Sequence, residues 1–280
     1  MFASILMTAC QDDLQIVDGL SVDTTTKQFK FTVKGDFTNK WKSVTRGTLT
    51  ADGTEITDLW VLDYQNGALV QQLHQESGDN DFGSPSLNLN LGNHHIYFVA
   101  SSGTSPTLST TDHTIKWETV NDTFYKDLSL TVESSGNGNR NVTLDRSVTK
   151  LKLTIADAVE EGTTGFYVTP HIWYYGIDYF TGRPAEPKVD KPIFVDYSSS
   201  NFGQTNTEVS VFGFSSSTEW NNDIAFYATD GVYVLAQVNI DSAPFKRNRA
   251  TEYCGPLYGS TGTMTLTLNS IWEDPERGTW

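Results

Sequence analysis

The clearest pattern along the chain is a pair of extended apolar segments, over residues 56–73, joined by a tight turn. The first segment is apolar on both faces, which predicts a strand buried between two layers. Asn66-Gly67 stands where a two-residue type I′ turn needs two residues at positive φ, so the stretch is predicted to be a β-hairpin. The apolar positions of the first strand are Leu59 and Val61 on one face and Trp60, Leu62 and Tyr64 on the other.

Period-two alternation of apolar and polar residues recurs along most of the chain. Residues 27–34 alternate cleanly, with Phe29, Phe31 and Val33 on one face, which predicts a half-solvated strand. Two segments, residues 157–161 and 217–222, are predicted to be short helices. Further strands are predicted over residues 41–50, 87–91, 95–101, 124–132, 142–155, 166–180, 192–197, 208–214, 224–228, 232–240 and 263–268.

Short strands separated by Gly, Asn, Asp, Ser and Pro clusters, without long helices between them, are typical of β-sandwiches. The chain has 280 residues, of which 38% are hydrophobic, enough for two domains with cores of ordinary size. We therefore predict an all-β protein with two β-sandwich domains in series. The predicted division is a signal remnant over residues 1–10, a flexible linker over 11–26, an N-terminal β-sandwich over 27–145 and a C-terminal β-sandwich over 146–280.

Charge excludes one class of partner. The chain has 34 acidic and 19 basic residues, a formal net charge of −15. This charge would repel a phosphate backbone, so we expect no binding of nucleic acid. No stretch approaches the roughly 18 consecutive apolar residues that a spanning helix needs.

The N-terminus offers a different kind of membrane anchor. Apolar and small residues fill positions 2–9, end at Cys10 and give way at once to Gln and Asp. This order is similar to the end of a bacterial lipoprotein signal, in which the cysteine thiol takes the lipid, although Met7 stands where Leu, Val or Ile is usual. An ordinary terminus with a stray cysteine is the alternative. Cys254 lies in a different context, and the two cysteines do not make a disulfide framework.

Several of these motifs together resemble the fimbrillin family of Bacteroidetes, the subunits and accessory lipoproteins of surface pili. Each motif is loose, and the order and spacing carry the resemblance, which spans most of the chain. The matching parts are the lipobox-like end at Cys10, the Thr45-Arg46 step, the LWVLDYQNGALV hairpin at residues 59–70, the GNHHIYFVAS segment at 92–101 and LDRSVTKLKLTI at 144–155.

The resemblance implies transthyretin-like β-sandwiches, export to the cell outer membrane or surface as a lipoprotein, and assembly with other pilus subunits by strand donation. In strand donation a neighbour supplies a β-strand to a groove left by the first strand. The family is cut after an arginine by a trypsin-like protease, and Arg46-Gly47 lies at the matching place. The alternative for Arg46 is a solvent-facing arginine in a strand. The run at residues 263–280 would either donate a strand or close its own sandwich; we favour closure for its apolar half, while Pro275 could not donate a ladder hydrogen bond.

The sequence gives little support to an enzyme. It has no zinc-protease motif, no Cys-x-x-Cys, no Gly-x-Ser-x-Gly and no phosphate-binding loop, so we expect no catalytic residue, cofactor or metal. His94 and His95 point to opposite faces of a strand, and we interpret them as part of a surface turn. The histidines are His74, His94, His95, His113 and His171.

Two binding alternatives remain. A surface lipoprotein that binds carbohydrate could use the aromatic stretch 172–180, although Trp173, Tyr175 and Ile177 share a parity that is equally typical of a core strand. Residues 76–83 have the oxygen-rich, glycine-turned composition of a calcium loop, with Asp79 and Asp81 as ligands. That loop lacks a spaced acidic residue to complete the shell, so a plain solvated turn is the favoured interpretation.

Overall fold

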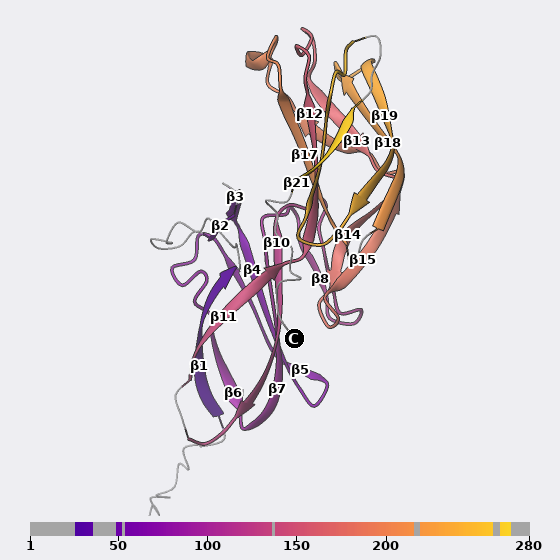
Figure 1. Ribbon diagram of the computed structural model, residues 1–280. Helices are drawn as coiled ribbons and strands as arrows, with labels where there is room; N and C mark the ends of the chain where they lie inside the picture. Colours follow the sequence, from indigo (N-terminus) through magenta and orange to yellow (C-terminus); the bar gives the residue numbers. More distant parts are fainter. Residues whose placement is uncertain are drawn as a thin grey trace, which may run out of the picture.

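The protein is elongated and built almost wholly from β-strands, with the strands of its first half in the lower part of Figure 1 and those of its second half in the upper part. The computed structural model describes residues 26–35, 49–51, 54–135, 138–215, 219–259 and 264–269. The predicted all-β class is confirmed. No helix in these ranges is long and apolar enough to cross a membrane.

The first half forms one seven-stranded sheet wrapped round an apolar core, in the order β5-β4-β7-β10-β11-β1-β6. Its two edge strands approach each other where Gln71 Oε1 accepts the N–H of Asn88 at 3.2 Å. The strands are β1 (Thr26–Gly35), β4 (Asp58–Gln65), β5 (Ala68–Glu76), β6 (Ser86–Asn90), β7 (Gly92–Ser101), β10 (Thr123–Val132) and β11 (Asn139–Arg146), with a separate ribbon of β2 (Leu49–Ala51) and β3 (Thr54–Ile56).

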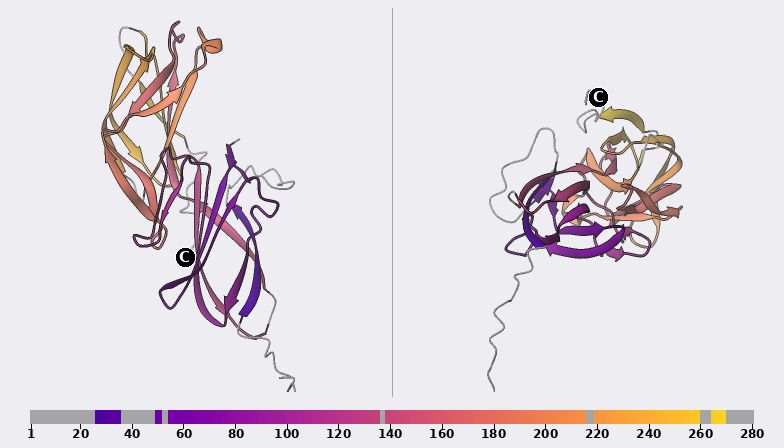
Figure 2. Two further views of the ribbon diagram at one scale, coloured as in Figure 1. Left: turned by 180° about the vertical axis from the view of Figure 1, so that it is seen from behind. Right: turned by 90° about the horizontal axis from the view of Figure 1, so that it is seen from below.

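The second half packs two sheets over a second core. The larger has the order β21-β20-β12-β17-β14-β9-β8 with β15 on β14, and the smaller has the order β16-β13-β18-β19. Figure 2 shows β21, in yellow, at the margin of this body. The strands are β8 (Thr107–Ser109), β9 (Thr114–Lys116), β12 (Val148–Ile155), β13 (Gly165–Thr169), β14 (Ile172–Asp178), β15 (Arg183–Val189), β16 (Ile193–Asp196), β17 (Thr207–Phe214), β18 (Glu219–Thr229), β19 (Val234–Phe245), β20 (Ala250–Gly255) and β21 (Thr265–Asn269).

The predicted hairpin is the β4–β5 pair. Asn66 and Gly67 have φ angles of 53° and 79°, the two positive values that a type I′ turn requires. Strand β4 is buried on both faces, as its pattern predicts. Leu59 and Val61 enter the first core, whereas Leu62 and Tyr64 belong to the second cluster, so the second covering layer is supplied by the other half of the chain.

An aromatic cluster joins the two halves. The hydroxyls of Tyr64 and Tyr179 lie 2.8 Å apart, and Tyr125 donates a hydrogen bond to the Tyr179 carbonyl at 3.0 Å. Phe180 stacks on Tyr97 with 5.0 Å between ring centroids. Burial raises the pKa of Tyr125 and Tyr179 well above the usual range, so both hydroxyls stay protonated and able to donate.

The change from the first sheet to the second occurs between β11 and β12, at Ser147, close to the predicted boundary at residue 146. The β8–β9 hairpin, however, lies before that boundary and pairs with Gly176–Asp178 of β14 in the second sheet. The two-domain division therefore stays a prediction, and a hairpin of the first half crosses it.

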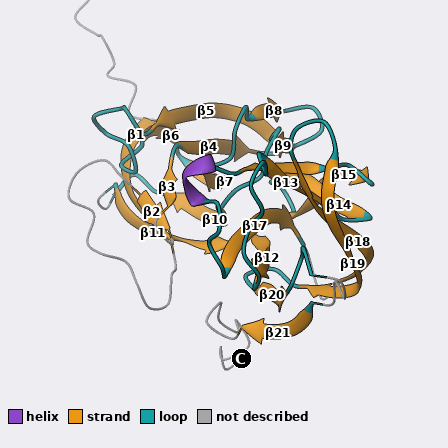
Figure 3. Ribbon diagram, turned by 90° about the horizontal axis from the view of Figure 1, so that it is seen from above, coloured by secondary structure: helices purple, strands orange, loops and turns teal. Residues whose placement is uncertain are grey.

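Both predicted helices are wrong. Residues 157–161 form a loop, because the Asp157 carboxylate accepts the backbone N–H groups of Leu257, Tyr258 and Gly259. Of the second predicted helix, residues 217–218 lie outside the described ranges and residues 219–222 open β18 instead. The one helical element in the described ranges is the 3₁₀ turn η1 (Ser199–Asn201), drawn in purple in Figure 3.

Strands β8, β9, β15 and β20 went unpredicted, and the last two illustrate different reasons. Strand β15 contains Pro184 and Pro187, which the pattern rules count against a strand, but it pairs with β14 alone, and an edge position tolerates proline. Strand β20 is short and carries no clear alternation, yet it pairs in parallel with β12.

The interpretation of His94 as part of a surface turn is wrong. Its side chain is buried, and Nδ1 donates to the Asp63 carboxylate at 2.8 Å, while His95 on the other face is exposed. Desolvation raises the pKa of the Asp63 carboxyl despite the bond from His94. The opposite orientation of the two histidines is confirmed, but His94 is a structural core residue.

Candidate functional site

The candidate site is the space between β6 and β11 that β1 fills, which we call the β1 slot. Strand β1 pairs in parallel with β11, from Lys30 opposite Asn139 to Gly35 opposite Leu144. On its other side it pairs antiparallel with β6, from Thr26 opposite Asn90 to Lys30 opposite Ser86. Strand β1 is therefore an inner strand of the first sheet, with a paired neighbour on each side.

The predicted apolar face of β1 fills the first core. Phe29, Phe31 and Val33 are each 3% exposed or less, and the rings of Phe31 and Phe98 meet edge to face with centroids 5.4 Å apart. The alternate residues of β1 are solvated. Removing β1 would thus open an apolar groove, because its three buried side chains are part of the first core.

Backbone hydrogen bonds extend the slot to the residues that precede β6. The N–H groups of Phe31 and Val33 donate to the carbonyls of Pro85 and Gly83, both at 2.9 Å. On the other side, Lys30 N–H donates to the Gly138 carbonyl at 2.9 Å. A Cβ on Gly138 would lie 2.0 Å from the Gln28 carbonyl oxygen, so only glycine allows this close approach of the two backbones.

The loop that supplies Gly83 is held by Gln75, a buried side chain at 2% exposure. Gln75 Nε2 donates to the Asp81 carbonyl at 2.9 Å, and its Oε1 accepts the Gly83 N–H at 3.2 Å. Sequence patterning did not select Gln75 as a site residue. Its only signal is its parity with Leu73, which places it on the inner face of β5.

The same loop contains the calcium alternative, and its geometry is that of a plain turn. Asp79 Oδ2 accepts the backbone N–H of Glu76 at 2.9 Å, and the Asp81 carbonyl accepts the N–H of Ser84 at 2.7 Å. In the ranges that the structure describes, no three His, Cys, Asp or Glu side chains are grouped so that they could hold a metal ion.

The residues predicted to act in processing lie outside the described ranges. Cys10 precedes the first described residue, and Arg46 and Gly47 lie in the interval between β1 and β2. Their roles therefore stay predictions. In the sequence, the interval that contains Arg46 connects β1 to the other strands of the first sheet.

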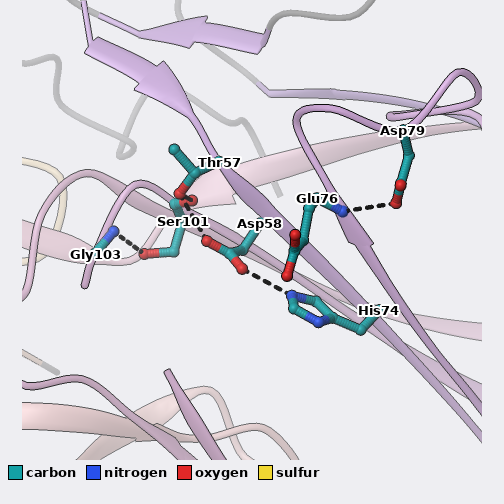
Figure 4. Close-up of polar contacts among 7 residues, drawn as sticks. All are labelled: Thr57, Asp58, His74, Glu76, Asp79, Ser101 and Gly103. Carbon is teal, nitrogen blue, oxygen red and sulfur yellow. Dashed lines mark hydrogen bonds and ion pairs between the residues drawn. The ribbon is translucent and has the colours of Figure 1, made fainter. Parts of the chain in front are cut away.

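Figure 4 shows a polar chain centred on Asp58, which brings a hydroxyl, a carboxylate and an imidazole together. Asp58 accepts from Thr57 Oγ1 at 2.6 Å and from His74 Nε2 at 2.7 Å. A nucleophilic triad places the histidine between the hydroxyl and the carboxylate, whereas here the carboxylate lies between the other two. The His74 ring is also stacked on Trp60, with centroids 3.8 Å apart. This arrangement ties β4 to β5, and no imidazole of the described residues lies against the Thr57 hydroxyl as a triad would require.

The aromatic stretch proposed as a carbohydrate platform is a core strand. Trp173, Tyr175 and Ile177 of β14 are 4% exposed or less. Trp173 Nε1 donates to the Phe212 carbonyl at 2.8 Å, which holds the ring inside the second sandwich. Their shared parity therefore reflects packing.

No protein-family model and no curated protein sequence matches the chain. Several solved structures are similar to it. The tip fimbrial protein Mfa3 of Porphyromonas gingivalis, truncated at its C-terminus, is 16% identical with a TM-score of 0.47, over 86% of this chain and 99% of that chain. A candidate adhesin of Bacteroides thetaiotaomicron is 8% identical with a TM-score of 0.48, over 87% and 96%.

A third solved structure, a candidate cell adhesion protein of Bacteroides ovatus, is 14% identical with a TM-score of 0.47, over 86% of this chain and 95% of that chain. At such low identity and TM-score, the likeness does not by itself assign a function. The proteins to which this chain is similar in structure are thus a candidate adhesin and a candidate cell adhesion protein of Bacteroides and a fimbrial tip protein of Porphyromonas.

Proposed function

We propose that this chain is a fimbrillin-like subunit or accessory protein of a cell-surface pilus, anchored in the outer membrane by lipid at Cys10 and assembled by strand donation. The observation that carries the proposal is the position of β1. It is the first described strand, it lies between two others, and it fills the core with three side chains. Such a strand is replaceable by another extended segment with the same alternation.

Cleavage after Arg46 would separate residues 26–35 from the rest of the first sandwich. The groove then exposes apolar side chains together with the unpaired edges of β6 and β11. An unsatisfied buried backbone group costs about 1–3 kcal/mol, so an open slot favours binding of a donor strand. Cleavage would convert a stable monomer into a subunit that polymerises.

An arginine-specific protease tests this step directly. We expect the uncut chain to be monomeric, and the cut chain to begin at Gly47 and form ladders that resist mild denaturation on electrophoresis. The matched control is Arg46→Gln, which keeps the interval but removes the site. Surface material from cells whose N-terminus is still the lipidated Cys10 would contradict cleavage and favour an anchor or accessory role.

The lipid anchor is tested by Cys10→Ala. We expect this variant to lose membrane partitioning and metabolic labelling with palmitate, because the thiol is the atom that takes the lipid. Retention of an acylated, membrane-bound product by Cys10→Ala would contradict the assignment. Cys254→Ala serves as the control, since its side chain is exposed on β20 and no role in anchoring is expected.

The carbohydrate-binding alternative finds weaker support. An aromatic row does cross the outer face of β16, β13 and β18, with Phe194 and Tyr227 on either side of Tyr167 at centroid distances of 4.9 and 5.0 Å. Tyr167 and Tyr227 are stacked on each other, however, so each ring covers one face of the other. The β1 slot therefore carries the proposed function.

A further inference from the structure

The turn between β18 and β19 presents an apolar tip, residues 232–235. Its four consecutive side chains are large, hydrophobic and exposed, the longest such run in the described chain. Their exposed fractions are 78% for Val232, 70% for Tyr233, 55% for Val234 and 36% for Leu235. Clusters of this kind on a soluble surface mark contact sites, because isolated exposed apolar residues are common but runs are not.

The apolar tip is exposed on all sides. Val234 and Leu235 are the first residues of β19, and consecutive residues of a strand point to opposite faces, yet both side chains are exposed. Val232 and Tyr233, in the bend before them, are exposed further still. A flat protein surface would cover one face and leave the other in water. The environment that suits this tip is one that surrounds it.

The backbone N–H groups of the turn, residues 230–233, all donate within the turn itself. The Asp230 carboxylate accepts the N–H groups of Val232 at 2.8 Å and Tyr233 at 2.6 Å, and these bonds hold the pKa of Asp230 below its usual range. Gly231 N–H donates to Thr229 Oγ1 at 3.0 Å, and Asp230 N–H donates to the Tyr233 carbonyl at 3.2 Å. A segment that leaves water loses the hydrogen bonds of its backbone to the solvent, and in this turn the N–H donors are paired before any partner is present.

The tip lies at the upper end of the molecule in Figure 1, and β1 begins at the lower end. The loops that end beside it, residues 156–164, 197–206 and 256–259, contain no Lys or Arg, while Glu160 and Glu161 are acidic. With a net charge of −15 on the whole chain, this end would be repelled by an anionic surface. A neutral surface is compatible with it.

We propose that the apolar tip inserts into the interfacial layer of a neutral, zwitterionic lipid bilayer. Tyrosine is suited to that layer because its ring is apolar and its hydroxyl stays hydrated, and valine and leucine reach the acyl boundary. The contact is independent of the β1 slot. It gives the molecule a membrane-contacting end opposite the strand on which its assembly is proposed to depend.

Flotation with phosphatidylcholine vesicles tests the contact, using the full chain with Cys10→Ser to remove the proposed acylation site. We expect the chain to float with these vesicles independently of salt, and to bind less to vesicles that contain phosphatidylglycerol. The double variant Val232→Ser/Tyr233→Ser should partition into the vesicles at least about tenfold less than the parent chain. It lacks two large apolar side chains whose transfer out of water favours binding. The matched control is Val189→Ser, a valine 61% exposed on β15, which should float like the parent chain.

A second measurement detects insertion directly and does not require a variant that has lost binding. In a chain with Cys10→Ser and Cys254→Ser, a polarity-sensitive dye at Val232→Cys should brighten on phosphatidylcholine vesicles, while the same dye at Val189→Cys should not. Failure of the parent chain to float, equal flotation of the double variant, or binding that requires anionic lipid and is lost at high salt would each overturn the proposal. Tip-dependent dimers in the absence of vesicles would overturn it too, in favour of a second copy of this chain as the partner.

Discussion

Replacing Phe31 by Ala is expected to lower the free energy of unfolding by about 3–5 kcal/mol, the usual cost of removing a buried phenyl ring. Phe31 is 0% exposed and lies between Phe29 and Phe98 in the first core. Urea unfolding followed by tryptophan fluorescence measures the change. The control is Thr32→Ala, an exposed residue of the same strand, for which a change within about 0.5 kcal/mol is expected.

The same pair of variants tests whether the slot is replaceable. If β1 competes with a donor for one groove, weakening it with Phe31→Ala should increase binding of a synthetic peptide of residues 26–35 added in trans, whereas Thr32→Ala should not. Binding that is the same in both variants, or stability that is unchanged by Phe31→Ala, would show that β1 does not hold the slot in the way the core packing indicates.

Replacing Asp122 by Ala is expected to lower the free energy of unfolding by a similar amount, about 3–5 kcal/mol, because it leaves a buried guanidinium without its carboxylate. Arg146 donates to Asp122 through Nε and Nη2, both at 2.7 Å, and the two side chains are 7% and 1% exposed. The pair ties the loop before β10 to the end of β11, where the chain passes to the second half.

Two controls separate the ion pair from simple packing. The double variant Asp122→Leu/Arg146→Met removes both charges and should recover much of the loss, since apolar replacements of a buried pair are often neutral. Asp145→Ala removes an exposed pair with Lys126, 3.1 Å apart, and should change the free energy of unfolding by about 0–1 kcal/mol. A loss as large for Asp145→Ala as for Asp122→Ala would contradict the argument from burial.

Local pattern determined much of this protein. Alternation identified β1 and its buried face, and the Asn66-Gly67 pair identified the central hairpin, because side-chain parity and turn φ angles depend on neighbouring residues alone. It also indicated that β4 would be covered on both faces. The apolar face of the β1 slot could therefore be predicted from the sequence.

The tertiary structure decided what lies opposite each face. Parallel pairing of β1 with β11 and the close contact of Gly138 with Gln28 join segments more than 100 residues apart in the chain, and no local signal encodes such pairing. The same holds for the β8–β9 hairpin, which lies between β7 and β10 of the first sheet in sequence but pairs within the second sheet. The burial of His94 was predicted wrongly for this reason. The alternation shows which face of the strand His94 occupies, but which strands cover that face depends on the whole fold. Strand pattern is set by short-range sterics, whereas pairing partners and desolvation are set by the whole fold.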